Sequence, residues 1–306
     1  MSEIPSPSTI TSETFQIVLN CYPSIVEKVY KSKIKDAKKV SEAIERDRWR
    51  FEELPSTVAQ LKSPIGTKVT TGKGKIDVRE RGLTKEAIER LVQWKITHGH
   101  SRPFLPAMVR KNEPSAVETQ TALALEKLSS TSSLSKPTPT PTTVEALNAV
   151  CKLTGIGPAT GTLILNIFDP VHIPFFQDEM YAWFFPDTKA DKLKYTQKEY
   201  MQLLEAVRPV LQRLNVKAIE LEKVSYVLGH LDLLEEQDKK KIVHSSREGS
   251  RQDIPNATED VKVEDTKDVQ PEHTPSVKKG TKRGANTATD ADQIQQPTKR
   301  QTRRKR

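Results

Sequence analysis

The stretch Leu153-Thr154-Gly155-Ile156-Gly157-Pro158 constrains the fold of this chain more than any other segment. Apolar residues at helical spacing precede it and follow it, so it joins two helices through a short turn. Pro158 suits the first turn of a helix, where its missing N–H costs nothing. Thr142 and Glu145 form a capping-box pattern at the start of the preceding helix. The stretch therefore predicts a helix-hairpin-helix over about residues 143–168.

The composition of this turn suggests contact with phosphate. Glycine adopts positive φ readily and lets a foreign group approach the backbone. The first N–H groups of the following helix lack intrahelical partners and carry the positive end of the helix dipole. Such a turn can hold a nucleic-acid backbone without reading its sequence. Alternatively, it is only a tight turn between two core helices. The predicted contacts are the backbone of Gly155, Gly157 and Thr160, with positive charge from Lys152, Lys95 and Arg102.

Composition and periodicity predict an all-α domain with disordered flanks. The chain has 306 residues, of which 35% are hydrophobic, 29% charged and 20 are proline, and its mean hydropathy is −0.60. No segment shows the alternation typical of strands. We expect disorder over 1–11, a helical domain over 12–236 with a flexible Ser/Pro linker at 129–142, and a disordered basic tail over 237–306.

The net charge of +9 is concentrated in that tail. From residue 239 onward the chain has 17 basic and 10 acidic residues, whereas the preceding part has 32 and 30. A nucleic-acid site on the domain must therefore be a local patch. Two basic clusters in the tail predict recognition by a nuclear import receptor, or a non-specific nucleic-acid arm, unless the tail is merely solvated. The clusters are Lys278, Lys279, Lys282 and Arg283, then Lys299, Arg300, Arg303, Arg304, Lys305 and Arg306.

Several classes of site are not expected. No apolar run approaches the roughly 20 residues that a membrane crossing needs, and the N-terminus lacks the features of a secretory signal. The two cysteines, Cys21 and Cys151, are too far apart for a disulfide framework or a cysteine-based zinc site. His98 and His100 have no third ligand nearby in sequence. We therefore expect neither metal nor cofactor.

Aromatic and basic residues are interleaved between Trp94 and Pro103. Candidates for a local basic patch are Lys95, His98, His100, Arg102 and Arg110, and the Trp94 ring is a candidate for stacking on a base. The alternative is a helix end at Gly99, with His98 bonded to the last carbonyls. Both interpretations can hold at once.

Asp178 follows an apolar run, Ile173-Pro174-Phe175-Phe176, at the start of another predicted helix. A carboxylate placed there can stabilise a developing oxocarbenium ion or activate a water molecule. A simpler interpretation is an acid that complements the helix dipole.

The residues from Leu153 to about Trp183 resemble the helix-hairpin-helix-Gly/Pro-Asp signature of the endonuclease III-like DNA glycosylase superfamily. The resemblance implies that fold, with Asp178 as the catalytic aspartate that stabilises the oxocarbenium ion at the sugar. It also implies a pocket for a flipped base lined by Phe176, Tyr181 or Trp183. Ala159 stands where bifunctional members carry a nucleophilic lysine, and no cysteine follows Cys151 to hold an iron–sulfur cluster. The segment from Trp94 to Pro103 is also similar to one in a set of uncharacterised eukaryotic proteins.

Three functions remain open from the sequence. The first is a nuclear DNA-binding protein of glycosylase-like fold that is non-catalytic or of vestigial activity. The second is a monofunctional base-excision DNA glycosylase that uses Asp178. The third is a helical interaction scaffold in which the hairpin is only architecture. The sequence indicates neither the base recognised nor the oligomeric state.

Overall fold

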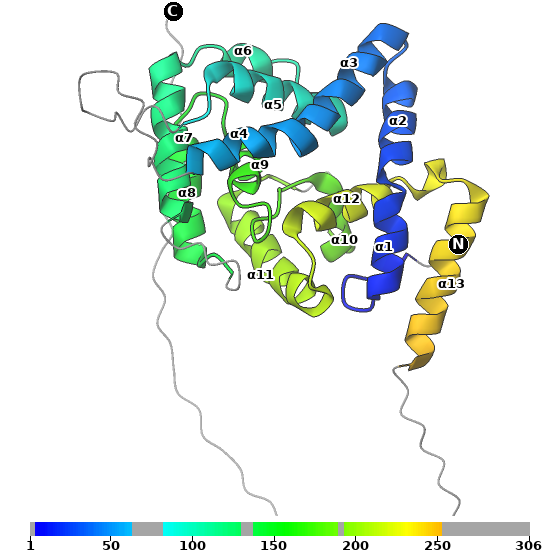
Figure 1. Ribbon diagram of the computed structural model, residues 1–306. Coiled ribbons are helices and arrows are strands. Elements are labelled where there is room, and N and C mark those ends of the chain that lie inside the picture. Colours follow the sequence, from blue (N-terminus) through cyan, green and yellow to red (C-terminus); the bar gives the residue numbers. More distant parts are fainter. Residues whose placement is uncertain (1–3, 63–81, 130–136, 189–192, 253–306) are drawn as a thin grey trace, which may run out of the picture. The chain divides into compact units, whose positions relative to one another are not determined.

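The computed structural model describes residues 4–62, 82–129, 137–188 and 193–252, and Figure 1 shows the arrangement of their helices. The described residues form no strand, so the predicted all-α class is confirmed. They all belong to one compact unit, Met1–Asn256, whereas the second unit, Ala257–Arg306, lies outside the described residues. None of the described helices combines the length and the apolar character that a membrane crossing needs.

The first part of the chain forms four α-helices in which local signals set the boundaries. Thr11 and Asp36 act as N-caps, since their side chains accept hydrogen bonds from the backbone N–H groups of Thr14 and Lys39 (3.1 Å each). Pro23 falls in the first turn of the second helix, so the chain breaks between the first two helices at Cys21. The elements are α1 (Ser12–Asn20), α2 (Tyr22–Lys33), α3 (Ala37–Arg48), a π-helical turn (Trp49–Glu53) and α4 (Leu54–Lys62).

The next three helices, α5 (Lys85–His98), α6 (Leu105–Val109) and α7 (Pro114–Ser129), precede the predicted hairpin. Thr84 is the N-cap of α5, because its hydroxyl accepts from the backbone N–H of Ala87 (3.2 Å). The end of α5 differs from the prediction. Its last carbonyl, that of His98, accepts from the Lys33 ammonium (2.9 Å) and the Tyr226 hydroxyl (3.2 Å), whereas the His98 side chain lies in the core.

Helices α8 (Thr140–Val150) and α9 (Pro158–Phe168) follow, and α9 is the central helix of the domain. Every residue of α9 from Ala159 to Phe168 is buried, and the helix contacts α4, α7, α8 and α11 (Figure 1). Gly161 lets α8 approach closely, because a Cβ atom at this position would lie 2.6 Å from Cδ1 of Leu147. The turn between α8 and α9 therefore joins two helices that pack closely on each other.

The last part of the described chain forms four α-helices and a 3₁₀ turn. They are α10 (Asp178–Phe184), α11 (Gln197–Leu214), α12 (Ala218–Gly229), a 3₁₀ turn (Leu231–Leu233) and α13 (Glu236–Gln252). Thr196 and Glu199 form a capping box at the start of α11, and Asn215 ends that helix in a left-handed conformation. Both α12 and α13 pack against α1 (Figure 1). The two ends of the described chain thus share one core.

The predicted disorder over 1–11 is wrong for residues 4–11. The indole N–H of Trp183 donates to the carbonyl oxygen of Pro5 (2.8 Å), and the Arg213 guanidinium donates to those of Pro7 and Ile10 (2.8 Å each). The Ile10 side chain is buried in the core. These contacts come from residues about 200 positions away, which local composition does not reveal.

Two other predicted boundaries need correction. The Ser/Pro linker at 129–142 is shorter than expected, because α8 begins at Thr140 with Pro139 as its N-cap, and the Thr142–Glu145 capping box does not form. Residues 130–136 lie outside the described residues. The tail predicted from 237 contains α13, which packs on α1 through the buried Ile242 and a hydrogen bond between Thr14 and Ser245 (2.8 Å). Both basic clusters of the tail lie outside the described residues.

Candidate nucleic-acid interface and pocket

A pocket of about 600 Å³ lies where the end of α5, α6, and the starts of α9 and α10 come together. This volume falls within the range of about 300–1,000 Å³ that is usual for sites of small ligands. Six of the predicted site residues line it: Lys95, Arg102, Gly157, Thr160, Phe176 and Asp178. The fold thus brings together residues from three separate parts of the sequence.

Gly155 shapes the turn on one side of this pocket. Its φ of +81° is the left-handed conformation that favours glycine. A Cβ atom here would lie 3.0 Å from Cβ of Met108 and 3.1 Å from Cγ2 of Val109, so the turn packs tightly on α6. The Asn112 side chain holds the preceding residue, since it accepts from the N–H of Thr154 (2.7 Å) and donates to its carbonyl (2.9 Å). Gly155 therefore has a structural role.

Gly157 differs, because it faces open space. No atom lies within 4 Å of the position that its Cβ would take, and its backbone is extended. The N–H groups of Gly157 and Ala159 donate to no acceptor within the described part of the chain. Those of Thr160 and Gly161, by contrast, donate to the Gly157 carbonyl. An anion can therefore approach the start of α9 on this side. Thr160 itself is buried and lines the pocket.

Asp178 is the first residue of α10, and its carboxylate forms hydrogen bonds with side chains outside that helix. Oδ1 accepts from the Tyr195 hydroxyl, and Oδ2 is paired with Nδ1 of His100. The side chain of Asp178 is 23% exposed, and that of His100 is 72% exposed. Burial, followed by the hydrogen bond to Asp178, raises the pKa of Tyr195, so this hydroxyl stays protonated and donates. The carboxylate is thus fixed at the pocket wall.

Tyr195, whose hydroxyl bonds to Asp178, has an unusual backbone conformation. Its φ of +55° lies in the left-handed region. A non-glycine residue held in this sparsely populated region costs on the order of 1–3 kcal/mol. The Arg102 guanidinium lies 5.5 Å from the centre of the Tyr195 ring. Strained residues of this kind concentrate at functional sites. The backbone of Tyr195 is consistent with a site that holds Asp178 in one position.

Lys95 enters the pocket from the last turn of α5. Burial lowers the pKa of its ammonium, Asp178 partly opposes this effect, and Arg102 adds to it. Two apolar side chains lie exposed at the same pocket: Phe104 is 80% exposed and Met108 is 43% exposed. The pocket therefore combines positive charge, a held carboxylate and an apolar rim.

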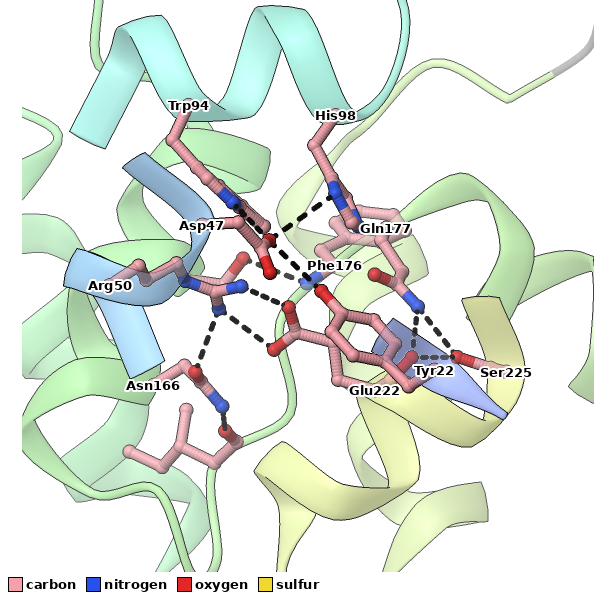
Figure 2. Close-up of polar contacts among 12 residues, drawn as sticks. Tyr22, Asp47, Arg50, Trp94, His98, Asn166, Phe176, Gln177, Glu222 and Ser225 are labelled. Carbon is pink, nitrogen blue, oxygen red and sulfur yellow. Dashed lines mark hydrogen bonds and ion pairs between the residues drawn. The ribbon is translucent and has the colours of Figure 1, made fainter. Parts of the chain in front are cut away.

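A buried ion pair supports the residue before Asp178 (Figure 2). The Arg50 guanidinium, in the π-helical turn, bonds both carboxylate oxygens of Glu222, with Nη2 to Oε2 at 2.8 Å, and also Oδ1 of Asn166 at 3.2 Å. The Gln177 amide donates to the Glu222 carbonyl (2.9 Å) and to the Ser225 hydroxyl (2.6 Å). The start of α10 is therefore tied to α12, and through Glu222 to Arg50.

The expected stacking role of Trp94 is wrong. Its side chain is 1% exposed, its indole N–H donates to Asp47 (2.8 Å), and its ring stacks on His98 with centroids 4.4 Å apart. His98 in turn stacks on Tyr226 (3.8 Å), and burial lowers its pKa far below the usual range, so it contributes no charge. An aromatic at helical spacing next to basic residues here belongs to the core.

Three other predicted residues also lie away from the pocket. Lys152 is exposed on the hairpin but does not line the pocket. Tyr181 and Trp183 are buried on α10 and do not line it either, whereas Phe176 does. Sequence reasoning missed Phe104 and Tyr195. Phe104 had a signal, an aromatic after the Arg102-Pro103 pair, whereas Tyr195 had none because its role depends on contacts between distant segments.

No group of three or more His, Cys, Asp or Glu side chains among the described residues is arranged to hold a metal ion. The pocket instead offers hydrogen-bond donors, the carboxylates of Asp178 and Glu179, and apolar surface. Comparison of the chain with family models, with curated proteins and with solved structures found no match.

Proposed function

We propose that this protein binds duplex DNA through the start of α9 and takes a nucleotide, turned out of the duplex, into the adjacent pocket. There the Asp178 carboxylate assists cleavage of the bond between base and sugar, which makes the protein a base-excision DNA glycosylase. The observation that supports this proposal is the shared pocket: Asp178, Gly157, Lys95 and Arg102 all line it. A scaffold protein needs no such combination.

The chemistry follows from the environment of Asp178. Cleavage of an N-glycosidic bond develops positive charge on the sugar, and a fixed carboxylate stabilises that charge. Tyr195 and His100 hold both carboxylate oxygens, so little rearrangement is needed when the charge develops. The open approach at Gly157 would place a phosphate beside the same pocket. A base in the pocket would then contact Phe176.

If the start of α9 binds DNA as proposed, the substitution Gly157→Glu should weaken DNA binding without unfolding the protein. The new side chain has room, so the free energy of unfolding should change by no more than about 1 kcal/mol. Its carboxylate would occupy the phosphate approach, so affinity for a short duplex should fall about 10- to 100-fold, as one or two charge-assisted hydrogen bonds are lost. Fluorescence anisotropy over a series of salt concentrations measures this.

Ser41→Glu is the matched control, because Ser41 is exposed on α3 and does not line the pocket. It introduces the same charge and should leave binding unchanged. Equal affinity of the wild type and Gly157→Glu, with both proteins folded, would refute this mode of DNA binding.

The catalytic part is tested by base release. Duplexes that each carry one deaminated, oxidised or alkylated base are incubated with the full-length protein, and free base is detected by mass spectrometry. Release of at least one base supports the proposal. No release across the set, from a protein that binds the same duplexes, would leave a DNA-binding protein without this activity.

We further propose that the protein acts in the nucleus. This rests on the two basic clusters of the tail, for example Lys278-Lys279 and Arg303-Arg304-Lys305-Arg306. Fluorescent fusions of the full chain and of a chain lacking residues 278–306 test it. The full chain should accumulate in nuclei and the shortened chain should not. The same distribution for both would contradict import through these clusters.

A further inference from the structure

We propose that a cavity formed by α3, α5 and the end of α6 binds the phosphate group of a phosphorylated serine or threonine in a partner protein. The cavity measures about 290 Å³ and shares no lining residue with the larger pocket described above. The inference therefore stands apart from the proposed DNA chemistry. The lining residues are Arg46, Glu89, Arg90, Gln93, Pro106 and Arg110.

The first argument is the charge of the cavity wall. Arg46 comes from α3, Arg90 from α5, and Arg110 follows the last residue of α6. Glu89 is the one carboxylate among the lining residues, so three positive charges less one negative charge leave a net charge of +2. Guanidinium groups match the oxygens of a phosphate with paired N–H donors and stay charged at neutral pH. A dianion is thus the complementary ligand.

The second argument is that these arginines are already positioned. The Arg90 guanidinium lies 4.3 Å from the ring centre of Trp49, which is itself buried. Nε of Arg110 lies 3.9 Å from Oε2 of Glu89, beyond hydrogen-bond distance. The half-buried Arg46 makes no hydrogen bond or ion pair with any residue that the structure describes. Donors are therefore held near one another and left available.

The environment of Arg46 shows the cost of this arrangement. Burial lowers the pKa of its guanidinium, and the nearby charge of Arg90 lowers it too, whereas Tyr30 and Glu42 act in the opposite direction. Arginine nevertheless remains protonated in proteins. The fold thus keeps like charges close together at a half-buried position, and a bound anion would relieve their repulsion.

The size and charge of the cavity favour a phosphorylated side chain over a DNA strand. Its volume lies just under the roughly 300–1,000 Å³ usual for a whole small ligand, so it suits one protruding group. A phosphorylated side chain carries a charge of about −1.5 to −2 on three acceptor oxygens at the end of a short stem. A DNA strand would instead bring further phosphates beside Glu89, which would repel them. A peptide can present a basic residue there.

The test uses full-length protein and a library of short peptides that carry a central phosphoserine or phosphothreonine among varied residues. Retained peptides are identified by mass spectrometry and then measured singly by fluorescence anisotropy. We expect retention of phosphorylated peptides with Arg or Lys near the phosphate, and none of their unphosphorylated forms. Absence of any retained phosphopeptide, or displacement of the peptides by inorganic phosphate at equal concentration, would overturn the inference.

Arg110→Gln should weaken binding of the retained peptides about 10- to 100-fold, since it removes charge-assisted hydrogen bonds. Its side chain is 68% exposed, so the fold should be unaffected. Arg46→Lys keeps the charge but loses the paired donors, and should weaken binding as well. Arg247→Gln is the control, because Arg247 is exposed on α13 outside this cavity and should bind as the wild type does. Unchanged binding by folded Arg110→Gln and Arg46→Lys would place the phosphate elsewhere.

Glu89→Gln tests the choice of partner. It should abolish the preference for peptides with Arg or Lys near the phosphate while leaving binding of the phosphate itself. A preference that persists in this variant would contradict the role given to Glu89.

A parallel measurement with duplex DNA separates this inference from the proposed function. Gly157→Glu should retain the phosphopeptides, and Arg110→Gln should bind duplex as the wild type does. Loss of duplex affinity in Arg110→Gln, without retention of any phosphopeptide by the wild type, would make the cavity a DNA contact and overturn the inference. Phosphopeptide binding by a protein that binds no duplex would support it and count against the proposed function alone.

Discussion

Replacing Glu222 by alanine is expected to lower the free energy of unfolding by about 3–5 kcal/mol, because it leaves the Arg50 guanidinium buried without its anion. Both side chains are at most 1% exposed. In the native protein Arg50 also lies 3.8 Å from the Trp94 ring, so it has no route to solvent without disruption of the core. Urea denaturation followed by circular dichroism measures the loss.

Glu52→Ala is the matched control for this ion pair. Glu52 pairs with Arg48 at 2.7 Å on the surface, where both side chains are more than half exposed. Removing a surface partner should cost no more than about 1 kcal/mol. If Glu222→Ala cost as little as Glu52→Ala, the buried pair would not be what holds α12 against the π-helical turn.

Asp178→Asn is expected to reduce base release about 10²- to 10³-fold, the range typical for loss of a fixed group that stabilises charge in the transition state. Asparagine has nearly the same shape and keeps one oxygen that accepts from the Tyr195 hydroxyl, but it lacks the negative charge. The loss should therefore appear in the rate constant measured with protein in excess over DNA, while duplex affinity and the melting temperature change little.

Asp187→Asn provides the control, since Asp187 is exposed beyond the end of α10 and does not line the pocket. It removes the same charge from the same region and should release base at the wild-type rate. Base release by Asp178→Asn at the wild-type rate would mean that another group carries the chemistry.

Much of the fold could be predicted from local signals. The Thr84 cap of α5, the break at Pro23 and the capping box of α11 each depend on residues close in sequence. The N-terminal segment was mispredicted because its order comes from carbonyl contacts with Trp183 and Arg213. Tertiary contacts of this kind leave no periodic pattern in the segment itself.

The candidate site was predictable only in part, for a similar reason. Gly157 and Asp178 lie within one recognisable pattern, and the structure places both at the pocket. Trp94 was also predicted as a site residue from its neighbours in sequence, but its side chain is in the core. Helical spacing cannot tell which side of a helix faces solvent at its end. Tyr195 gave no signal, since only the folded chain brings its hydroxyl to Asp178.

The N-terminal segment has a practical consequence for recombinant work. Pro5, Pro7 and Ile10 supply acceptors for Trp183 and Arg213, so trimming the chain back to the first helix would leave both side chains unsatisfied. Trp183 shares a seven-residue helix with Asp178. A shortened version chosen for crystallisation or high-throughput screening would therefore have an altered helix at its pocket. Loss of activity in that version would not show that the intact chain is inactive.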